Sequence, residues 1–449
     1  MTDIAIIVLA AGKGTRMKSA SPKVLHKAAG WSLLAHVLHA AKALAPARTV
    51  IVAGSGMDGV AAEARAIVPE AAIVLQEERQ GTAHAVSMAE PALRGFSCRV
   101  LVLYADAPLI RPETLAAVSA GDAAMTVLGF EAADPTGYGR LVRTSSGDVV
   151  AIREQLDASP DERVINLCNS GIISISSELL WQLLPKIGNS NAKQEYYLTD
   201  LVGLVAATGA RIGLAVCPES EVAGVNDRVQ LAAVEAGFQN RYRRQHMLNG
   251  VTLTAPETVY FSADTEIGED VTIEPHVVFG PGVAVASNVE ILAFSHIEGA
   301  SIAAGARIGP YARLRPGAEI GANAHIGNFV EVKKAVIGKG AKANHLSYIG
   351  DAKVGAGSNI GAGTITCNYD GYEKHLTDIG ENVFVGSNTA LVAPVKVGDG
   401  ANIAAGSIIT RDVPADALAI SRAELRVREG WALRYREIKK ARKAEKAKG

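Results

Sequence analysis

The chain has 449 residues and a formal net charge of −1, and its 48% hydrophobic and 20% charged content is typical of a soluble globular protein of two or three domains. The near-zero charge argues against a global attraction to nucleic acid or to an anionic membrane surface, and no apolar run is long enough to span a bilayer. No signal peptide is evident, and four scattered cysteines predict reduced thiols in a cytoplasmic protein.

Up to about residue 228, short β-branched runs alternate with amphipathic stretches. Strands are expected at 4–9, 49–53, 72–75 and 99–104, and helices at 33–44, 82–89 and 112–118. This alternation predicts an α/β domain, residues 1–228, with a mainly parallel Rossmann-like sheet covered on both faces. Ligands of such sheets bind beyond the carboxyl ends of the strands, where the turns after Leu9 and Tyr104 both fall.

The first of these turns lies in VLAAGKGTRMKSASPK, residues 8–23. Its glycines match neither a dinucleotide-binding fingerprint nor a P-loop. Nucleotidyl transfer needs a backbone cradle for phosphates, which 10–14 can supply, and fixed cations, which Arg16 and Lys23 can supply. Asp106 ends the strand VLVLYAD, where its carboxylate can hold Mg²⁺, and Asn226 in GVND offers a second oxygen ligand.

The pattern becomes helical at residues 229–249, which predicts a connecting helix. From residue 250 to 449 the rhythm changes, because an aliphatic residue followed by a small or polar residue recurs at steps of six, as in Ile302 and Ile308 or Ile320 and Ile326. Hexapeptide repeats of this kind predict a parallel β-helix, in which stacked coils bury a shared aliphatic column. A flexible glycine-rich linker would not hold an aliphatic residue to a fixed period.

Several stretches of the repeats carry large polar side chains that a β-helix core does not need. His345 stands out, because repeat counting places Arg315, Lys333, Tyr348, Asn359, Asn368 and Tyr369 within one to three coils of it. Acyl transfer to an amine needs a base with a pKa near neutral, and a histidine meets this need. His325 lies in an ordinary repeat, whereas His375, at the end of an inserted loop, stays open as an alternative base.

The last segment, residues 424–449, carries ten Lys/Arg against four Glu. Such a charge run is most often a solvated basic tail, and a nucleic-acid-binding tail is the alternative. Nothing else in the chain supports the alternative.

Motifs in the first half resemble those of sugar-phosphate nucleotidylyltransferases. They are LAAGKGTRM followed by SPKVLH, QGTAHAV at 80–86, DPTGYGR at 134–140, Glu154, CNSGI at 168–172 and GVND at 224–227. Together with the repeats, residues 4 to 432 resemble the bacterial bifunctional N-acetylglucosamine-1-phosphate uridylyltransferase/glucosamine-1-phosphate N-acetyltransferase family. The motifs are highly specific in combination.

The resemblance implies which residues bind the uridine nucleotide and its sugar. They are Leu9, Ala10, Ala11, Gly12, Lys23, Gln76, Gly81, Thr82, Tyr104, Ala105, Asp106, Gly139, Glu154, Asn169 and Asn226. It also implies catalytic roles for Arg16 and Lys23, and Mg²⁺ ligands at Asp106 and Asn226. The family has Tyr-Gly-Asp where this chain has Tyr104-Ala105-Asp106, and we expect the added methyl to crowd the nucleotide slightly or to alter the backbone angle.

For the second half, the resemblance implies a left-handed β-helix that forms a homotrimer with acetyl-transfer sites shared between neighbouring chains. His345 would be the base, with glucosamine 1-phosphate bound by Arg315, Lys333, Tyr348 and Asn359. The implied acetyl-CoA site comprises Ala362, Asn368, Tyr369, Ser387, Ala405 and Arg422.

The activity so implied begins with acetylation of glucosamine 1-phosphate by acetyl-CoA. Uridylyl transfer from UTP to N-acetylglucosamine 1-phosphate follows, and the product feeds peptidoglycan and lipopolysaccharide synthesis. The expected partners are these small molecules, without nucleic acid or membrane insertion.

Two other functions fit the same two-domain plan. One is a single-activity nucleotidylyltransferase whose β-helix serves only regulation or assembly, which the polar cluster around His345 argues against. The other is a non-catalytic exchange-factor subunit of translation, which the presence of Arg16, Lys23 and Asp106 argues against.

Overall fold

The computed structural model describes residues 3–447, and its contacts divide the chain into two compact units. The first unit runs to Asn249 and also includes Pro256–Thr265 and Phe279–Gly282. The second begins at Gly250 and contains the remaining segments. The two units therefore interleave along the chain between residues 250 and 282.

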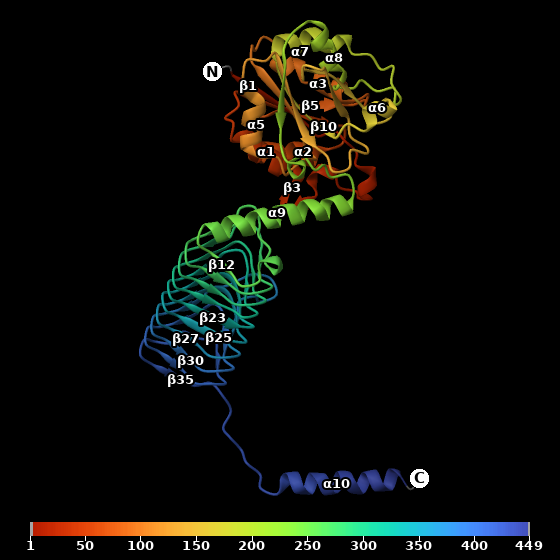
Figure 1. Cartoon of the computed structure of the whole chain (residues 1–449). Coiled ribbons are helices and arrows are strands. Elements are labelled where there is room, and N and C mark those ends of the chain that lie inside the picture. Colours follow the sequence, from red (N-terminus) through yellow and green to blue (C-terminus); the bar gives the residue numbers. More distant parts are fainter. Residues whose placement is uncertain (1–2, 448–449) are drawn as a thin grey trace. The chain divides into compact units, whose positions relative to one another are not determined.

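The first unit is built on a mainly parallel sheet (Figure 1). Its strand order is β11 (Ile212–Val216), β7 (Met125–Glu131), β10 (Leu167–Ser176), β6 (Arg99–Tyr104), β1 (Ile4–Leu9), β4 (Arg48–Gly54) and β5 (Ala72–Gln76). Strand β10 alone on this path runs antiparallel to its neighbours. A hairpin of β8 (Arg140–Arg143) and β9 (Val149–Arg153) extends the sheet beside β10.

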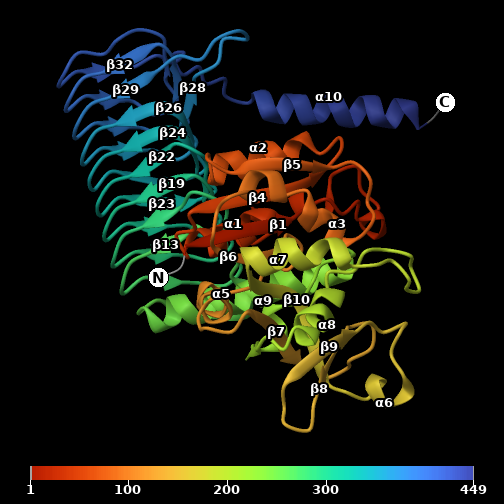
Figure 2. The same ribbon diagram turned by 90° about the horizontal axis from the view of Figure 1, so that it is seen from above.

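Alternate residues of the central strands point to opposite faces, so both faces bury apolar side chains. On β1, Ile6 and Val8 join one hydrophobic core, and Ala5 and Ile7 join the other. The first core is covered by α1 (Leu33–Lys42), α2 (Asp58–Ile67) and α5 (Pro112–Ser119). The second is covered by α3 (Thr82–Ser87), α4 (Glu90–Leu93), α7 (Ser177–Leu183) and α8 (Asp200–Ala207). The predicted doubly covered sheet is confirmed (Figure 2). Short elements complete the unit: β2 (Lys27–Ala28), β3 (Trp31–Ser32) and α6 (Pro160–Arg163).

The predicted connecting helix is α9 (Arg228–Leu248). It begins where the Asp227 carboxylate accepts a hydrogen bond from the Gln230 backbone N–H at 2.9 Å. Farther along, the Gln239 side chain exchanges two hydrogen bonds with the backbone of Phe261, both at 2.8 Å. These bonds attach Pro256–Thr265 to the first unit, and β15 (Val278–Phe279) lies where the units interleave.

The second unit is a parallel β-helix, and Figure 1 shows its stacked coils. One face holds β12 (Thr252–Leu253), β14 (Thr272–Ile273), β17 (Glu290–Ile291), β20 (Arg307–Ile308), β23 (His325–Asn328), β25 (Lys342–His345), β27 (Asn359–Ile360), β30 (Phe384–Val385), β33 (Asn402–Ile403) and β35 (Leu418–Ala419). The aliphatic residues of successive coils stack in register and are fully buried, as Ile291, Ile308 and Ile326 show. The predicted repeat is confirmed.

Two further faces complete each coil. The second face holds β18 (His296–Ile297), β21 (Arg313–Leu314), the first parts of β24 (Glu331–Ile337) and β26 (Tyr348–Val354), then β28 (Ile365–Cys367), β31 (Ala390–Val392) and β34 (Ile408–Ile409). The third holds β13 (Glu266–Ile267), β16 (Ala284–Val285), β19 (Ala300–Ile302), β22 (Ala318–Ile320), the last parts of β24 and β26, β29 (Thr377–Ile379) and β32 (Val395–Val397).

The corners between faces recur in register and use left-handed backbone angles. The corner between the first and second faces carries Phe294, Tyr311, Phe329 and Leu346, with φ from 50° to 62°. The corner between the second and third faces carries Gly299 and Gly317, then Lys334 and Asp351 with φ of 44° and 45°. Glycine adopts such angles without strain, so the change from glycine to Lys334 and Asp351 marks these two coils as different.

The end of the chain forms α10 (Trp431–Lys446), whose described residues are all exposed. The last two residues of the predicted basic tail, 448–449, lie outside the described residues. Within residues 3–447 no helix is both long and apolar enough to cross a membrane. All four cysteines are free, and Cys98, Cys168 and Cys217 are buried.

Candidate functional site

The first unit contains a cavity of about 230 Å³ at the carboxyl ends of β1 and β6. Ten of the residues predicted for the nucleotide site line it: Leu9, Ala10, Ala11, Gly12, Lys23, Gln76, Gly81, Thr82, Tyr104 and Asp106. The structure thus brings together segments from residues 9 to 106 at the edge where ligands of parallel sheets bind.

The glycine turn has two identifiable structural reasons. Gly14 has φ of 61°, and a Cβ there would lie 2.4 Å from Cβ of Lys23, so only glycine lets the lysine stem pass. The Arg79 Nε donates a hydrogen bond to the Ala11 carbonyl at 2.6 Å and fixes the turn from across the cavity. The turn is therefore shaped to admit Lys23, whose side chain is largely buried.

Lys23 lies between two oxygen atoms from distant parts of the chain. Its Nζ is 2.5 Å from Asp106 Oδ2 and 3.2 Å from Asn226 Oδ1. Both oxygens therefore converge on one cation. A carboxylate oxygen and an amide oxygen are the kind of ligands that a hard metal ion prefers. No cluster of three or more acidic, His or Cys side chains suited to a metal occurs among residues 3–447. Asp106 and Asn226 supply two oxygen ligands, so a metal held between them would take its other ligands from phosphate and water.

Three of the residues predicted for the nucleotide and its sugar, Gly139, Glu154 and Asn169, form a neighbouring group outside the cavity lining. A Cβ on Gly139 would lie 3.3 Å from Glu154 Oε1, and the Gly139 carbonyl accepts a hydrogen bond from the Asn169 N–H at 2.8 Å. Burial raises the pKa of Glu154, although a hydrogen bond from Thr199 at 3.2 Å partly opposes this effect. Burial likewise raises the pKa of Tyr104.

Two predicted residues lie apart from the cavity. Arg16 is exposed on a short 3₁₀ helix, Thr15–Met17, and does not line it. Ala105 is fully buried in the hydrophobic core and does not line the cavity. Conversely, Arg79 and Glu195 line the cavity but were not predicted. Both lie in irregular segments whose place in space no periodic pattern indicates.

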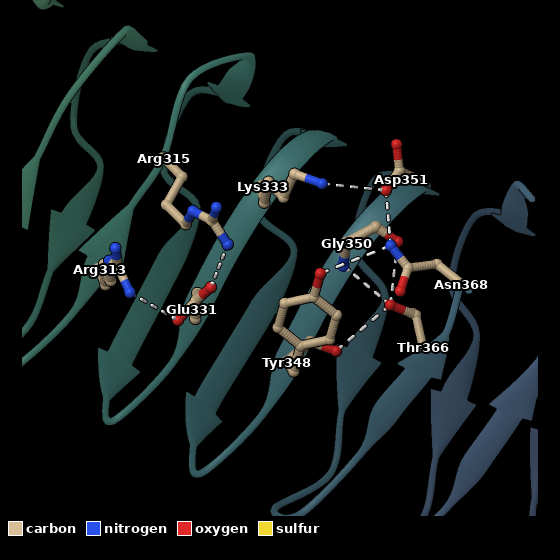
Figure 3. Close-up of polar contacts among 9 residues, drawn as sticks. All are labelled: Arg313, Arg315, Glu331, Lys333, Tyr348, Gly350, Asp351, Thr366 and Asn368. Atoms are coloured by element: carbon tan, nitrogen blue, oxygen red, sulfur yellow. Dashed lines mark hydrogen bonds and ion pairs between the residues drawn. The ribbon is translucent and has the colours of Figure 1, made fainter. Parts of the chain in front are cut away.

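The β-helix carries a polar cluster on its second face (Figure 3). Arg315 Nη1 lies 2.9 Å from Glu331 Oε1, while Arg313 reaches the other carboxylate oxygen at 3.5 Å. Lys333 Nζ lies 3.7 Å from Asp351 Oδ2, and the same oxygen accepts a hydrogen bond from Asn368 Nδ2 at 2.5 Å.

The cluster brings together four of the predicted residues. Tyr348 Oη lies 3.5 Å from Asn368 Nδ2, which completes the set Arg315, Lys333, Tyr348 and Asn368. A hydrogen bond to the neighbouring Lys333 and the charge of that lysine lower the pKa of Lys374. The site therefore gathers cations around few carboxylates, an arrangement suited to a phosphate.

His345 lies on the other side of the corner, at the end of β25. Its Nδ1 is 2.6 Å from Asn328 Oδ1, so Nδ1 donates to this oxygen and, in the neutral ring, Nε2 keeps a free lone pair. Ala362, Ser387 and Ala405 occupy the equivalent place in later coils, each one residue before a left-handed corner residue. His345 thus heads a column that contains three of the predicted acetyl-CoA residues.

The remaining predicted residues lie near this column. Asn359 pairs with Lys342 on the first face, and Arg422 Nη1 donates to the Ala405 carbonyl at 2.8 Å. Tyr369 is exposed in the inserted loop, where its hydroxyl donates to the Gly371 carbonyl. In the same loop His375 Nε2 lies 2.8 Å from Asp370 Oδ2, so the alternative base is already engaged by a carboxylate.

The predicted acetyl-transfer residues therefore flank a convex edge. His345 is on the first face, and Lys333 and Tyr348 are on the second. Between them runs the corner column of Phe294, Tyr311, Phe329 and Leu346, each 46% to 62% exposed. A convex edge cannot enclose a substrate by itself.

Comparisons with known proteins match both units. Residues 6–156 match the model of the MobA-like NTP transferase domain, and residues 299–334 and 377–411 match that of the bacterial transferase hexapeptide. The relatives are named "Bifunctional protein GlmU". One from Azorhizobium caulinodans is 55% identical and covers 97% of each chain, and one from Nitrobacter hamburgensis is 56% identical and covers 96% of each. A third, from Rhodospirillum rubrum, is 56% identical over 97% of this chain and 98% of its own.

Proposed function

The chain belongs to the family of bifunctional GlmU proteins, and from this premise we propose how its two activities are divided between its units. It is a bifunctional enzyme with a nucleotidyltransferase and a hexapeptide acetyltransferase. Residues 1–228 carry uridylyl transfer from UTP to N-acetylglucosamine 1-phosphate, and residues 250–449 carry N-acetylation of glucosamine 1-phosphate by acetyl-CoA. The single observation that carries the proposal is an identity of 55% to 56% over alignments of 437 and 436 residues that span both units.

This full-length match also decides between the alternatives left open by the sequence. A nucleotidylyltransferase with a merely structural β-helix, or a non-catalytic exchange factor, would not match bifunctional relatives over 96–97% of the chain. The column headed by His345 supports the same choice, because it presents a free imidazole nitrogen that a structural coil does not need.

In the first unit, the nucleotide lies in the cavity beside the glycine turn, with its sugar toward Gly139, Glu154 and Asn169. Lys23 offsets the charge that develops on the phosphates as pyrophosphate leaves, and Asp106 holds its ammonium in place. Arg16 is exposed, and we assign to it the binding of the pyrophosphate that leaves. Mg²⁺ would be held by Asp106 and Asn226, and it would supply further neutralisation of phosphate charge.

In the second unit, His345 Nε2 takes a proton from the amine of glucosamine 1-phosphate as the amine nitrogen bonds to the thioester carbonyl carbon. The C–S bond then breaks, and the same proton passes to the departing sulfur, so that coenzyme A leaves as the thiol. Arg315 and Lys333 hold the sugar phosphate, and Tyr348 and Asn359 hold the sugar. Acetyl-CoA lies along Ala362, Ser387 and Ala405, with Asn368, Tyr369 and Arg422 beside it.

The convex edge supports a homotrimer. The half-exposed corner column is the apolar surface that a second copy of the chain would cover, and that copy would turn the edge into an enclosed site. A cytoplasmic location is part of the same proposal, supported by four free cysteines and by small-molecule substrates of central metabolism.

The proposal is tested by assaying both reactions in purified protein and in Asp106→Ala. Removing this carboxylate should slow uridylyl transfer by at least about 10²–10³-fold, because both Lys23 and the metal lose their anchor. Acetyl transfer should be unchanged. Asp122→Ala is the matched control, because Asp122 is 90% exposed in a surface ion pair of the same unit. Equal loss of both activities in folded Asp106→Ala would contradict the division between units.

A further inference from the structure

Asp351 has no role in the proposed chemistry, yet it lies at the centre of the cluster on the second face. Its Oδ2 contacts both the Lys333 ammonium at 3.7 Å and the Asn368 amide at 2.5 Å (Figure 3). Lys333 is assigned above to the sugar phosphate and Asn368 to acetyl-CoA. The Lys333 and Asp351 side chains are only 12% and 19% exposed, and Asn368 is buried. These contacts are therefore weakly screened by solvent.

The backbone conformation at Asp351 would be easier for glycine, which indicates that the side chain has a specific role. Asp351 has φ of 45° at a corner where earlier coils place Gly299 and Gly317. A non-glycine residue in this region is strained by about 1–3 kcal/mol, although Asp is among the residues that tolerate it best. Asp270 has φ of 56° at a different corner, but it is exposed. Left-handed geometry alone therefore does not require the side-chain contacts that Asp351 makes.

We propose that Asp351 is a positioning residue that holds Lys333 and Asn368 side by side, and so couples the sugar-phosphate site to the acetyl-CoA site. This inference rests on the roles proposed above for Lys333 and Asn368. The Asp351 carboxylate holds both the Lys333 ammonium, which binds the phosphate, and the Asn368 amide, which binds acetyl-CoA. It thereby fixes the position of one group relative to the other. Without it, the neighbouring cations Lys333 and Lys374 repel each other with less compensation.

A positioning role and a purely electrostatic role of Asp351 predict opposite effects on substrate binding. Asp351 is an anion next to a phosphate site, so simple charge removal would strengthen binding of glucosamine 1-phosphate. Loss of positioning predicts the opposite for both substrates. Hydrogen bonds to charged groups are strong enough that Asp351→Asn should raise KM for glucosamine 1-phosphate and for acetyl-CoA, with kcat/KM falling about tenfold to a hundredfold.

The experiment is steady-state acetyl transfer by the full chain, with each substrate varied in turn. Asp270→Asn is the matched control, because it makes the same substitution at another left-handed corner of the β-helix and should leave both KM values unchanged. Circular dichroism and thermal unfolding of the same preparations report whether the β-helix is folded. An unchanged or lower KM for glucosamine 1-phosphate in Asp351→Asn would overturn the inference.

A mutant cycle tests the coupling itself. Lys333→Ala and Asn368→Ala should be non-additive when Asp351 is present, because each change disturbs the shared carboxylate, and additive in Asp351→Asn. Additivity in both backgrounds would overturn the linking role. Absence of acetyl transfer in the unaltered protein would instead contradict the proposed function, so the two failures are distinguishable.

Discussion

At the scale of single residues, neighbouring side chains decide what an ionisable group can do. Asn328 engages one ring nitrogen of His345 and leaves the other free, whereas Asp370 engages Nε2 of His375. Nε2 of His375 is thus already hydrogen-bonded to a carboxylate at 2.8 Å and does not face solvent as a free acceptor. The sequence left both histidines open as the base, and these contacts favour His345.

We therefore predict that His345→Ala slows acetyl transfer by about 10²–10⁴-fold, the usual contribution of a general base. The KM for acetyl-CoA should change little, because the column of Ala362, Ser387 and Ala405 is intact. The measurement is kcat against pH for the unaltered protein, His345→Ala and His375→Ala. The fall in kcat should be seen at every pH, and only in His345→Ala. Near-normal turnover of His345→Ala together with loss in His375→Ala would show that the base has been misassigned.

At the scale of elements, the sequence predicted those parts whose pattern is periodic. Strands β1 and β6 match their expected ranges, and the six-residue step predicted the β-helix, because one buried aliphatic residue per face repeats at a fixed interval. The antiparallel direction of β10 was not predicted, because direction depends on how connections pack and not on the residues of the strand. The left hand of the β-helix likewise came only from the family resemblance.

The candidate sites show the same limit. Asp106 could be predicted because it follows a strand at one edge of the sheet, and Lys23 because it is a fixed cation downstream of the glycine turn after the first strand. The side-chain partners Asn328, Glu331 and Asp351 could not, because their roles depend on corners that bring two faces together. Counting repeats shows in which coil a residue lies, but not on which face of the β-helix its side chain finds a partner.

The junction of α3 with the segment at Tyr196 provides a prediction for an element of the first unit. Gly81 has φ of 118°, and a Cβ there would lie 2.5 Å from the Tyr196 carbonyl oxygen. Gly81→Ala should therefore push this segment away from the nucleotide cavity, reduce uridylyl transfer and lower stability. Gly56→Ala is the control, because Gly56 also has positive φ, 74°, but has nothing within 4 Å of the added Cβ.

Both variants place alanine at a positive φ, but Gly81, with φ of 118° and ψ of 178°, lies in a region used almost only by glycine, and only there must backbone atoms also move. Gly81→Ala should therefore lower stability by about 1–3 kcal/mol more than Gly56→Ala. Thermal unfolding and uridylyl transfer measure the difference. Equal stability and equal activity of the two variants would contradict the steric argument.

At the scale of the whole molecule, the chain crosses between its two units more than once. Pro256–Thr265 lies beyond the first residues of the β-helix in sequence but packs in the first unit. Gln239 is fully buried against Phe261, and Arg243 donates to the carbonyls of Val259 and Glu257 at 2.9 and 3.0 Å. Helix α9 therefore supports a segment that belongs by sequence to the repeat half.

This interleaving predicts how the acetyltransferase half behaves when it is produced alone. A fragment of residues 227–449 keeps the bonds from Gln239 and Arg243, whereas one of residues 250–449 loses four of them and exposes Phe261. At about 1 kcal/mol for each bond, the shorter fragment should unfold roughly 5–15 °C lower.

The longer fragment should carry Val234→Glu and Phe238→Gln, because these residues otherwise expose the surface that packs against Met17 and Leu109. Its mass in solution should be that of a trimer with full acetyl transfer, since each convex edge needs a second copy. A fully active monomer would contradict the shared site, and equal unfolding temperatures would contradict the supporting role of α9.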